Sequence, residues 1–209
     1  MQKQTNSSIP ATNVCVYCGS GSGVDPVYAA SARILGRNLA EAGMGLIYGG
    51  GGMGLMGEVA RSVLDHGGYV TGIIPQFLCD REQMLKNVND LIVTDDMHQR
   101  KMLMFQKSAA FVALPGGIGT LEELVEQLTW AQLGRHVKPI VIANIENFWE
   151  PLKGLFAHMK NEKFIREGLE VNFEIVDNAE DIVTNLQNLM MAAETDAVAE
   201  QVEQITDKF

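Results

Sequence analysis

The chain has 209 residues, of which 46% are hydrophobic and 20% charged. This composition predicts one globular domain with at most a tail, and it excludes global disorder. The formal net charge of −10 lies entirely in residues 167–209, which hold eleven acidic residues and one lysine, whereas residues 1–166 hold 15 acidic and 15 basic residues. The acidity therefore does not exclude a phosphate-bearing ligand from the first 166 residues.

Apolar runs alternate with helical patterns after a polar leader over residues 1–12. The predicted order is a strand over 13–17, a helix over 26–42, a strand over 45–48, a helix over 54–65, strands over 69–74 and 91–94, a helix over 96–107, a strand over 109–114, a helix over 120–133, a strand over 139–143, a helix over 148–159, a strand over 173–176 and a helix over 179–191. Nearly continuous apolar strands that alternate with helices predict an α/β fold, a Rossmann-like doubly wound parallel sheet with helices on both faces.

This fold is expected to occupy residues 13–191 as a single domain, followed by a peripheral acidic helix or tail over 192–209. Three cysteines do not make a disulfide framework, and the N-terminal sequence has no apolar signal-peptide core. The longest apolar runs are too short to cross a membrane. These features predict a cytoplasmic protein.

Glycines gather where the predicted strands end. Fifteen of the 21 glycines lie in residues 19–72, and three more lie in residues 116–119. Clusters follow the strands at 13–17, 45–48 and 109–114. In doubly wound folds, ligands bind beyond the carboxyl ends of the strands. We therefore expect the functional site at this edge of the sheet.

The strongest motif covers residues 114–123, LPGGIGTLEE. A buried strand ends at Leu114, glycines turn the chain, and a helix is expected to start at Thr120. The free N–H groups and the positive end of the helix dipole predict a phosphate site. Thr120 and Glu123 also fit a capping box, in which each side chain satisfies a backbone N–H of the other. Two adjacent acids, Glu122 and Glu123, favour a carboxylate that faces a sugar beside that phosphate.

A second cluster, MHQRK, covers residues 97–101 early in the preceding helix. Arg100 and Lys101 point about 100° apart on a helix and can make two different contacts. The alternative is a solvated basic pair. His98 is interpreted as a cap or surface residue.

Two weaker motifs compete with this interpretation. Residues 52–57, GMGLMG, satisfy the dinucleotide fingerprint G-x-G-x-x-G, but the next strand ends at Pro75 without the acidic residue that would hold a ribose. A close-packed turn is therefore favoured over NAD binding. Cys15 and Cys18 have the spacing of a redox or zinc pair, yet they lie within and at the end of a strand, which favours structural cysteines. No metal cluster is apparent.

The motifs at 97–101 and 115–123, together with GGGGMGLMG at 49–57, resemble the LOG ("lonely guy") family, cytokinin riboside 5′-monophosphate phosphoribohydrolases. The resemblance covers about residues 13–190. It implies hydrolysis of the N-glycosidic bond of a nucleoside 5′-monophosphate, which releases adenine or an N6-modified adenine and ribose 5-phosphate without a cofactor or metal. Related proteins carry the label of lysine decarboxylases, but the chain shows no pyridoxal-phosphate lysine motif.

The resemblance also implies site residues, with Arg100 and Glu123 as the catalytic pair. Its substrate contacts correspond to Glu82, Arg100, Lys101, Gly116, Gly117, Ile118, Gly119, Thr120, Leu121, Glu122, Glu123 and Thr129. Ile118 stands where an aromatic residue is common. The implied partners are a nucleotide substrate and at least one further copy of the chain, which lends residues to the cleft. Neither nucleic acid nor a membrane is expected as a partner. The alternatives are a non-catalytic nucleotide- or cofactor-binding carrier of the same fold and an NAD-dependent oxidoreductase.

Overall fold

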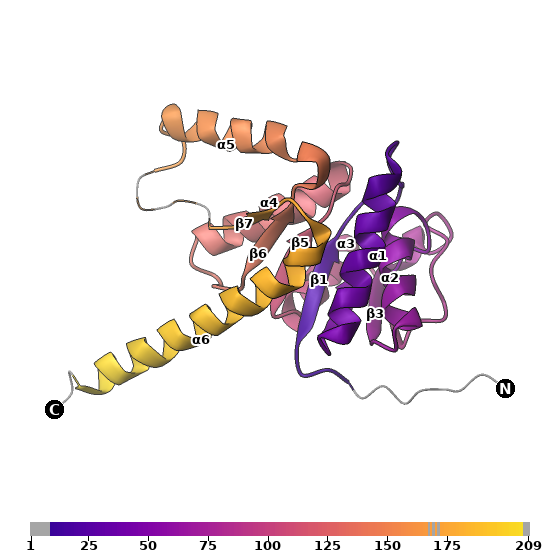
Figure 1. Cartoon of the computed structure of the whole chain (residues 1–209), viewed down its shortest axis with the longest axis horizontal. Coiled ribbons are helices and arrows are strands. Elements are labelled where there is room, and N and C mark those ends of the chain that lie inside the picture. Colours follow the sequence, from indigo (N-terminus) through magenta and orange to yellow (C-terminus); the bar gives the residue numbers. More distant parts are fainter. Residues whose placement is uncertain (1–8, 167, 169, 171, 207–209) are drawn as a thin grey trace.

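A computed structural model describes residues 9–166, 168, 170 and 172–206, and in these residues seven strands form one sheet. The sheet order is β4-β3-β2-β1-β5-β6-β7, and every neighbouring pair is parallel (Figure 1). The strands are β1 (Asn13–Tyr17), β2 (Gly45–Tyr48), β3 (Val70–Pro75), β4 (Asp90–Thr94), β5 (Ala110–Ala113), β6 (Ile140–Ala143) and β7 (Glu174–Val176). The predicted parallel α/β sheet is confirmed.

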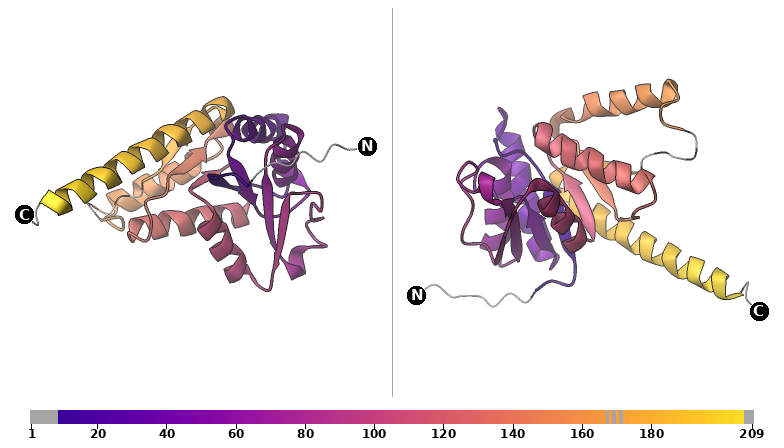
Figure 2. Two further views of the ribbon diagram at one scale, coloured as in Figure 1. Left: turned by 90° about the horizontal axis from the view of Figure 1, so that it is seen from below. Right: turned by 180° about the vertical axis from the view of Figure 1, so that it is seen from behind.

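Helices cover both faces of the sheet (Figures 1 and 2). They are α1 (Pro26–Glu41), α2 (Gly54–Asp65), α3 (Met97–Lys107), α4 (Ile118–Gln132), α5 (Glu150–Asn161) and α6 (Ile182–Thr206), with short 3₁₀ turns η1 (Gln76–Leu78), η2 (Ile145–Asn147) and η3 (Ala179–Asp181). Helices α1, α2 and the start of α6 pack in one core cluster, and α3, α4 and α5 pack in the other. None of the helices in the described part of the chain combines the length and apolar character that a membrane span requires.

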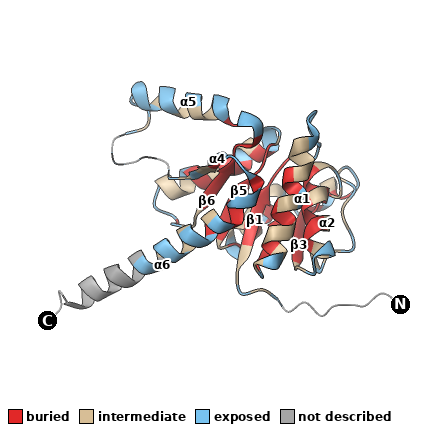
Figure 3. Ribbon diagram, in the orientation of Figure 1, coloured by how far each residue is buried: buried red, intermediate tan, exposed pale blue. Residues whose placement is uncertain are grey.

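The central strand β1 shows why the sheet is buried on both sides. Val14 and Val16 pack in the cluster of α1, α2 and α6, while Cys15 and Tyr17 pack in the cluster of α3, α4 and α5. Successive side chains of a strand point to opposite faces, so a strand covered on both faces must be apolar at every position. Figure 3 shows the inner strands buried between the helices.

Helix α6 is longer than the helix predicted over 179–191. The chain makes the η3 turn and then one helix of 25 residues. Ile182, Val183 and Leu186 anchor its start in the core, and its C-terminal half extends away from the body (Figures 1 and 2). No glycine or proline occurs between residues 182 and 206, so nothing in this stretch breaks the helix. The peripheral helix, one of the two alternatives for 192–209, is therefore present as far as Thr206, and residues 207–209 lie outside the described residues.

The order of the strands locates a crevice. β1 pairs with β2 on one side and with β5 on the other, so the chain winds in opposite directions from this point. Loops that leave β1 and β5 at their carboxyl ends therefore diverge, and ligands of open α/β sheets bind between such loops. Here those loops carry the glycines at 19–23 and 116–117.

Candidate functional site

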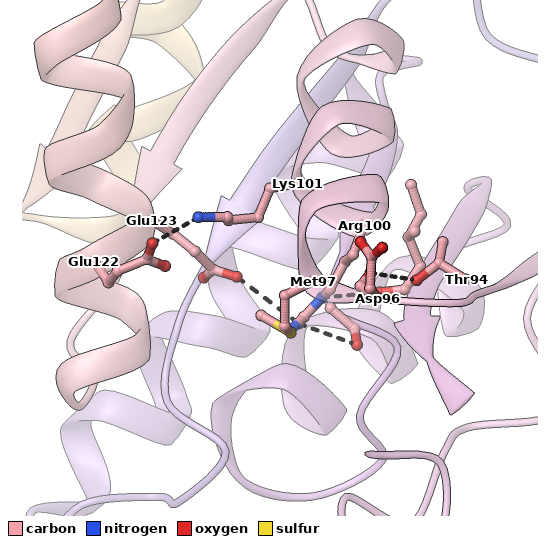
Figure 4. A network of polar contacts seen from close by, with 9 residues as sticks. Thr94, Asp96, Met97, Arg100, Lys101, Glu122 and Glu123 are labelled. Carbon is pink, nitrogen blue, oxygen red and sulfur yellow. Dashed lines mark hydrogen bonds and ion pairs between the residues drawn. The ribbon is translucent and has the colours of Figure 1, made fainter. Parts of the chain in front are cut away.

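The start of α3 is fixed by its own side chains. Asp96 Oδ1 accepts a hydrogen bond from the Gln99 N–H at 2.8 Å, and Gln99 Oε1 accepts one from the Asp95 N–H at 2.9 Å. The first bond satisfies an N–H group that the first turn of a helix leaves free, and the second fixes the residue before the N-cap. They orient the next residue, Arg100, toward the sheet, whereas Lys101 faces α4 (Figure 4). His98 is exposed.

Arg100 is buried beneath the ends of two strands, with 5% of its surface exposed. Its Nε donates to the carbonyl of Ile73 at 3.2 Å and its Nη2 to the carbonyl of Gly49 at 3.3 Å. Nη2 also lies 3.8 Å from Glu123 Oε1. A side chain at position 49 would collide with the guanidinium, so the glycine that follows β2 makes room for it.

Glu123 is the partner of Arg100 across the cleft and is only 8% exposed. Burial raises the pKa of its carboxyl from 4.5 to about 7, against the opposing effect of Arg100, while Glu122 and Glu82 add repulsion. Figure 4 shows Glu123 pointing from α4 toward Arg100 on α3. A buried carboxyl that titrates near neutrality, in a cleft and beside a fixed cation, is the environment of a catalytic group.

The capping box, the alternative considered for Thr120 and Glu123, is wrong. The helix starts two residues earlier than expected, with extended Gly117 as N-cap and Ile118 as its first residue. Thr120 therefore lies inside the first turn, buried against Gly116, and Glu123 is free to turn toward Arg100. The error arose because glycines at 117 and 119 were assigned to a loop, whereas Gly119 adopts the helical conformation.

The first turn of α4 is open toward the cleft. Among the described residues, no side chain caps it, and a Cβ atom added at Gly117 or Gly119 would meet no atom within 4 Å. By contrast, α2 is closed, because the Leu55 N–H donates to the carbonyl of Gly19 at 3.0 Å and the Met56 N–H donates to the same carbonyl at 3.3 Å. An anion at a helix start needs free N–H groups. The open helix is therefore α4, and the dinucleotide motif at α2 serves close packing.

Glu82 approaches the same cleft from the turn after η1. Its carbonyl accepts the N–H of Gly52 at 3.1 Å, which ties the turn to the glycine run after β2. Its Oε2 is buried and has no hydrogen-bond partner among the described residues. Burial raises the pKa of this carboxyl, opposed by Arg100. An unpaired buried carboxylate oxygen is unfavourable unless a ligand supplies the donor.

Known proteins are similar to this chain over most of its length. A family model described as "Possible lysine decarboxylase" matches residues 56–186. The "Probable cytokinin riboside 5′-monophosphate phosphoribohydrolase LOG4" of Oryza sativa subsp. japonica is 42% identical over 177 residues, which cover 85% of this chain and 77% of the relative. The "Cytokinin riboside 5′-monophosphate phosphoribohydrolase LOG" of the same plant is 42% identical over 174 residues, 83% of this chain and 72% of the relative. The chain belongs to the LOG family.

The fold of this LOG-family member is shared more widely. The molybdenum cofactor binding protein from the phototrophic bacterium Rippkaea orientalis superposes with a TM-score of 0.66 at 22% identity, covering 88% of this chain and 99% of that protein. At this identity the likeness establishes the fold alone. It shows that one scaffold occurs in proteins that carry different names.

Lys101 links the two helices that border the cleft. Its Nζ lies 2.6 Å from Glu122 Oε1 and 3.0 Å from Glu126 Oε1, both on α4. Sequence reasoning missed Glu126, although its position four residues after Glu122 places both on one helix face. The two predicted directions of Arg100 and Lys101 are confirmed. The alternative of a solvated basic pair is wrong, because Arg100 is buried and the Lys101 side chain, 13% exposed, is paired with two carboxylates.

Other predicted site residues lie at varying distances from this cluster. Gly116 and Gly117 form the turn before α4, Ile118 is exposed, and Leu121 is half-buried. Thr129 is exposed on α4, six residues beyond Glu123, and its hydroxyl donates to the carbonyl of Val125 at 2.7 Å. Within this chain, Thr129 is not brought together with the Arg100–Glu123 pair.

The cysteines do not form a second site. Cys15, Cys18 and Cys79 are free and buried, and burial raises the pKa of the Cys15 and Cys18 thiols. Buried thiols with raised pKa values are poor nucleophiles and poor metal ligands. In the part of the chain that the structure describes, no group of three His, Cys, Asp or Glu residues could hold a metal ion.

Two cavities that sequence reasoning did not assign adjoin the start of α4. The inner cavity, about 310 Å³, lies between the loops after β1 and β5. The outer cavity, about 410 Å³, lies between α4 and α5. The glycine-serine run at 19–23 was the available signal for the inner cavity. No local pattern indicated the outer one, because its walls come from segments 30 residues apart in the chain.

Proposed function

We propose that this chain is a nucleoside 5′-monophosphate phosphoribohydrolase that cleaves the N-glycosidic bond of adenosine 5′-monophosphate or of its N6-modified cytokinin forms. The observation that carries the proposal is the buried Arg100–Glu123 pair beside the open first turn of α4. The names of the relatives supply the substrate class.

The 5′-phosphate binds at the first turn of α4. Free N–H groups of residues 118–120 and the helix dipole favour an anion there, and glycines at 117 and 119 let the phosphate approach the backbone. Fixing the phosphate sets the position of the sugar relative to Glu123, one turn farther along the same helix. Positioning of this kind lowers the barrier by removing motional freedom before the reaction.

Cleavage of a glycosidic bond builds positive charge on the sugar ring. Glu123 in its carboxylate form stabilises that charge and accepts a proton from the attacking water. The water oxygen bonds to C1′, and the bonding electrons leave with the base, which takes up a proton. Arg100 holds Glu123 in place and partly offsets the effect of burial on its pKa. The unpaired Oε2 of Glu82 accepts hydrogen bonds from ribose hydroxyls.

We also propose that the protein acts in the cytoplasm as a homodimer whose cleft includes residues of the second copy. Ile118 and Val125 are 82% and 38% exposed and share one face of α4 with Thr129, and Leu133 at the C-cap of this helix is 76% exposed. An apolar helix face of this kind suits burial against a partner. Thr129 would then contact the substrate of the partner copy. Light scattering after size exclusion measures the mass, and a monomer would contradict this part of the proposal.

Incubation with adenosine 5′-monophosphate and with its N6-isopentenyl form, followed by chromatography of the released base, tests the activity. We expect both base and ribose 5-phosphate as products, and the ratio of the two kcat/KM values identifies the preferred base. Glu123→Gln is the control, because it keeps the side-chain shape and removes the carboxylate. Absence of base release from either nucleotide would refute the proposal.

The alternative is a non-catalytic nucleotide- or cofactor-binding carrier, because a fold shared with a molybdenum cofactor binding protein does not by itself imply catalysis. The open first turn of α4 would serve a bound phosphate group in either case. A carrier would bind adenosine 5′-monophosphate without releasing adenine. Calorimetric binding measured beside the cleavage assay distinguishes the two functions.

A further inference from the structure

Phe148 stands between the two cavities beside the start of α4. The inner and outer cavities share Gly116, Gly117 and Phe148 in their linings. Two of these residues are glycines. Among the described residues, Phe148 therefore supplies the only side chain common to both walls, and without its ring the two spaces would join.

The segment that carries Phe148 is held by many contacts. Its ring packs edge-on against Tyr28, with ring centroids 5.8 Å apart, and against Trp149 at 5.0 Å. The backbone N–H of Trp149 donates to buried Asn144 Oδ1 at 2.8 Å. The two preceding residues, Glu146 and Asn147, have φ values of 50° and 58°. Such backbone is unfavourable without glycine and persists where the surroundings fix it, most often at functional sites.

The two cavities differ in chemistry. The inner one is lined by the loop 19–23 with its two serine hydroxyls, by the turn before α4, and by the side chains of Leu55, Phe148 and Tyr28. Tyr28 packs so close to Gly23 that a side chain there would lie 2.7 Å from its ring. The outer one is walled by apolar side chains, namely Ile118, Leu121, Phe148, Trp149, Leu152 and Leu155, together with Pro151. The inner cavity suits a phosphate, whereas the outer cavity offers little to stabilise a charge.

The order of strands gives the direction in which a nucleotide lies. Arg100 contacts the ends of β2 and β3, the inner cavity lies over β1 and β5, and Phe148 follows β6. A substrate with its sugar near Arg100 and Glu123 and its first phosphate at α4 therefore points any further phosphate at Phe148. To extend beyond it, the ligand would have to displace the ring and place its charge against apolar walls that offer no partner for it.

We propose that Phe148 determines specificity for nucleoside monophosphates by closing the phosphate compartment behind the first phosphate. This inference rests on the proposed function, and it names Phe148 as the residue that excludes nucleoside di- and triphosphates. Tyr28 and the η2 segment are positioning elements that hold the ring in place. The predicted role is steric, so it depends on side-chain size at position 148.

Steady-state kinetics on adenosine mono- and diphosphate with Phe148→Ala tests the proposal. We expect kcat/KM for the diphosphate, relative to the monophosphate, to rise at least about tenfold. Phe148→Leu, a smaller truncation that preserves more of the packing, should give a smaller rise and serves if the alanine variant does not fold. Leu155→Ala is the matched control, because Leu155 lines only the outer cavity, and it should leave the ratio unchanged.

An unchanged ratio in folded Phe148 variants that still cleave the monophosphate would overturn the inference. Equal effects of Leu155→Ala would do so as well, since they would show a general loosening of this region. If the wild-type protein released no base, the proposed function would fail separately. The steric role of Phe148 would then be tested by calorimetry. Phe148→Ala should still bring the Kd of the diphosphate closer to that of the monophosphate.

Discussion

Glu123 illustrates how burial and charge compete at one side chain. Its carboxyl lies 3.8 Å from Arg100, an arrangement that by itself would lower its pKa, yet desolvation outweighs this attraction and raises the pKa to about 7. Both protonation states are consequently populated at neutral pH. A group of this kind changes its charge with little driving force, as general base catalysis requires.

The pH dependence of activity follows from this pKa. If the carboxylate of Glu123 is the active form, kcat/KM should fall as the pH is lowered through about 7 and reach a plateau above it. Initial rates with adenosine 5′-monophosphate between about pH 5 and 9 measure the profile. A flat profile through neutrality would show that protonation of Glu123 does not limit the reaction.

The free energy of unfolding should show the opposite pH dependence, decreasing as the pH rises. A carboxyl whose pKa is raised from 4.5 to about 7 in the folded state favours folding fully below its unfolded pKa and loses that contribution as the pH rises through the folded value. With about 1.4 kcal/mol for each pKa unit, the loss approaches roughly 3 kcal/mol above neutrality. Glutamine stays neutral, so Glu123→Gln should unfold at a higher temperature than wild type at pH 8.

At pH 4.5 the two proteins should unfold at nearly the same temperature, because Glu123 is then mostly protonated. Differential scanning calorimetry at both pH values makes the comparison. A glutamine variant that is less stable than wild type at pH 8 would indicate that the ion pair with Arg100 is worth more than the desolvation it requires.

At the scale of elements, two glycine-rich helix starts perform different tasks. α2 uses its glycines for close packing, since a Cβ atom at Gly57 would collide with the carbonyl of Gly52. Gly52 in turn donates its N–H to Glu82. α4 keeps its first turn free for a ligand. The same local composition therefore yields a closed helix start in one place and an open one in the other.

Gly57→Ala should lower both Tm and kcat/KM, because the shift it forces on Gly52 reaches Glu82. Gly154→Ala is the matched control, for a Cβ atom at this position in α5 meets no described atom within 4 Å. Replacing glycine by alanine in a helix interior stabilises by about 0.5–1 kcal/mol, so the control should gain stability and keep its activity. Thermal melts measure Tm and initial rates measure kcat/KM for both variants. Wild-type Tm and kcat/KM in Gly57→Ala would mean that the backbone at Gly52 can shift without moving Glu82.

The elements also show what a sequence can and cannot predict. The strands and the two directions of Arg100 and Lys101 follow from local periodicity, which the fold preserves. The predicted start of α4 was two residues late because glycine has a low intrinsic helix propensity, whereas Gly119 lies in the first turn of this helix. Phe148 was missed because its neighbour Tyr28 lies 120 residues away in the chain, and only the sheet order brings them together.

For the molecule as a whole, part of the negative charge lies at the C-terminal end of the chain. Residues 194–209 carry five acidic residues and one lysine, and they follow the part of α6 that packs in the core. Removal of residues 194–209 should therefore leave Tm and kcat/KM close to wild type. Melts and rates of the truncated protein check this. A large loss of either would mean that the extended helix contacts the body or a second copy.

The pairing of β1 with β5 has a consequence for how the protein folds. Val14 pairs with Ala110, 96 residues later in the chain, so the centre of the sheet closes only after most of the domain has been arranged. Contacts between residues far apart in the sequence form slowly, because the intervening chain must first be ordered. The cleft spans this same junction, with Arg100 contacting the β2–β3 side and Glu123 following β5. During refolding from denaturant, activity should consequently return more slowly than helical circular dichroism, and equal rate constants would contradict this order. A newly synthesised chain would acquire its secondary structure before it could process any nucleotide.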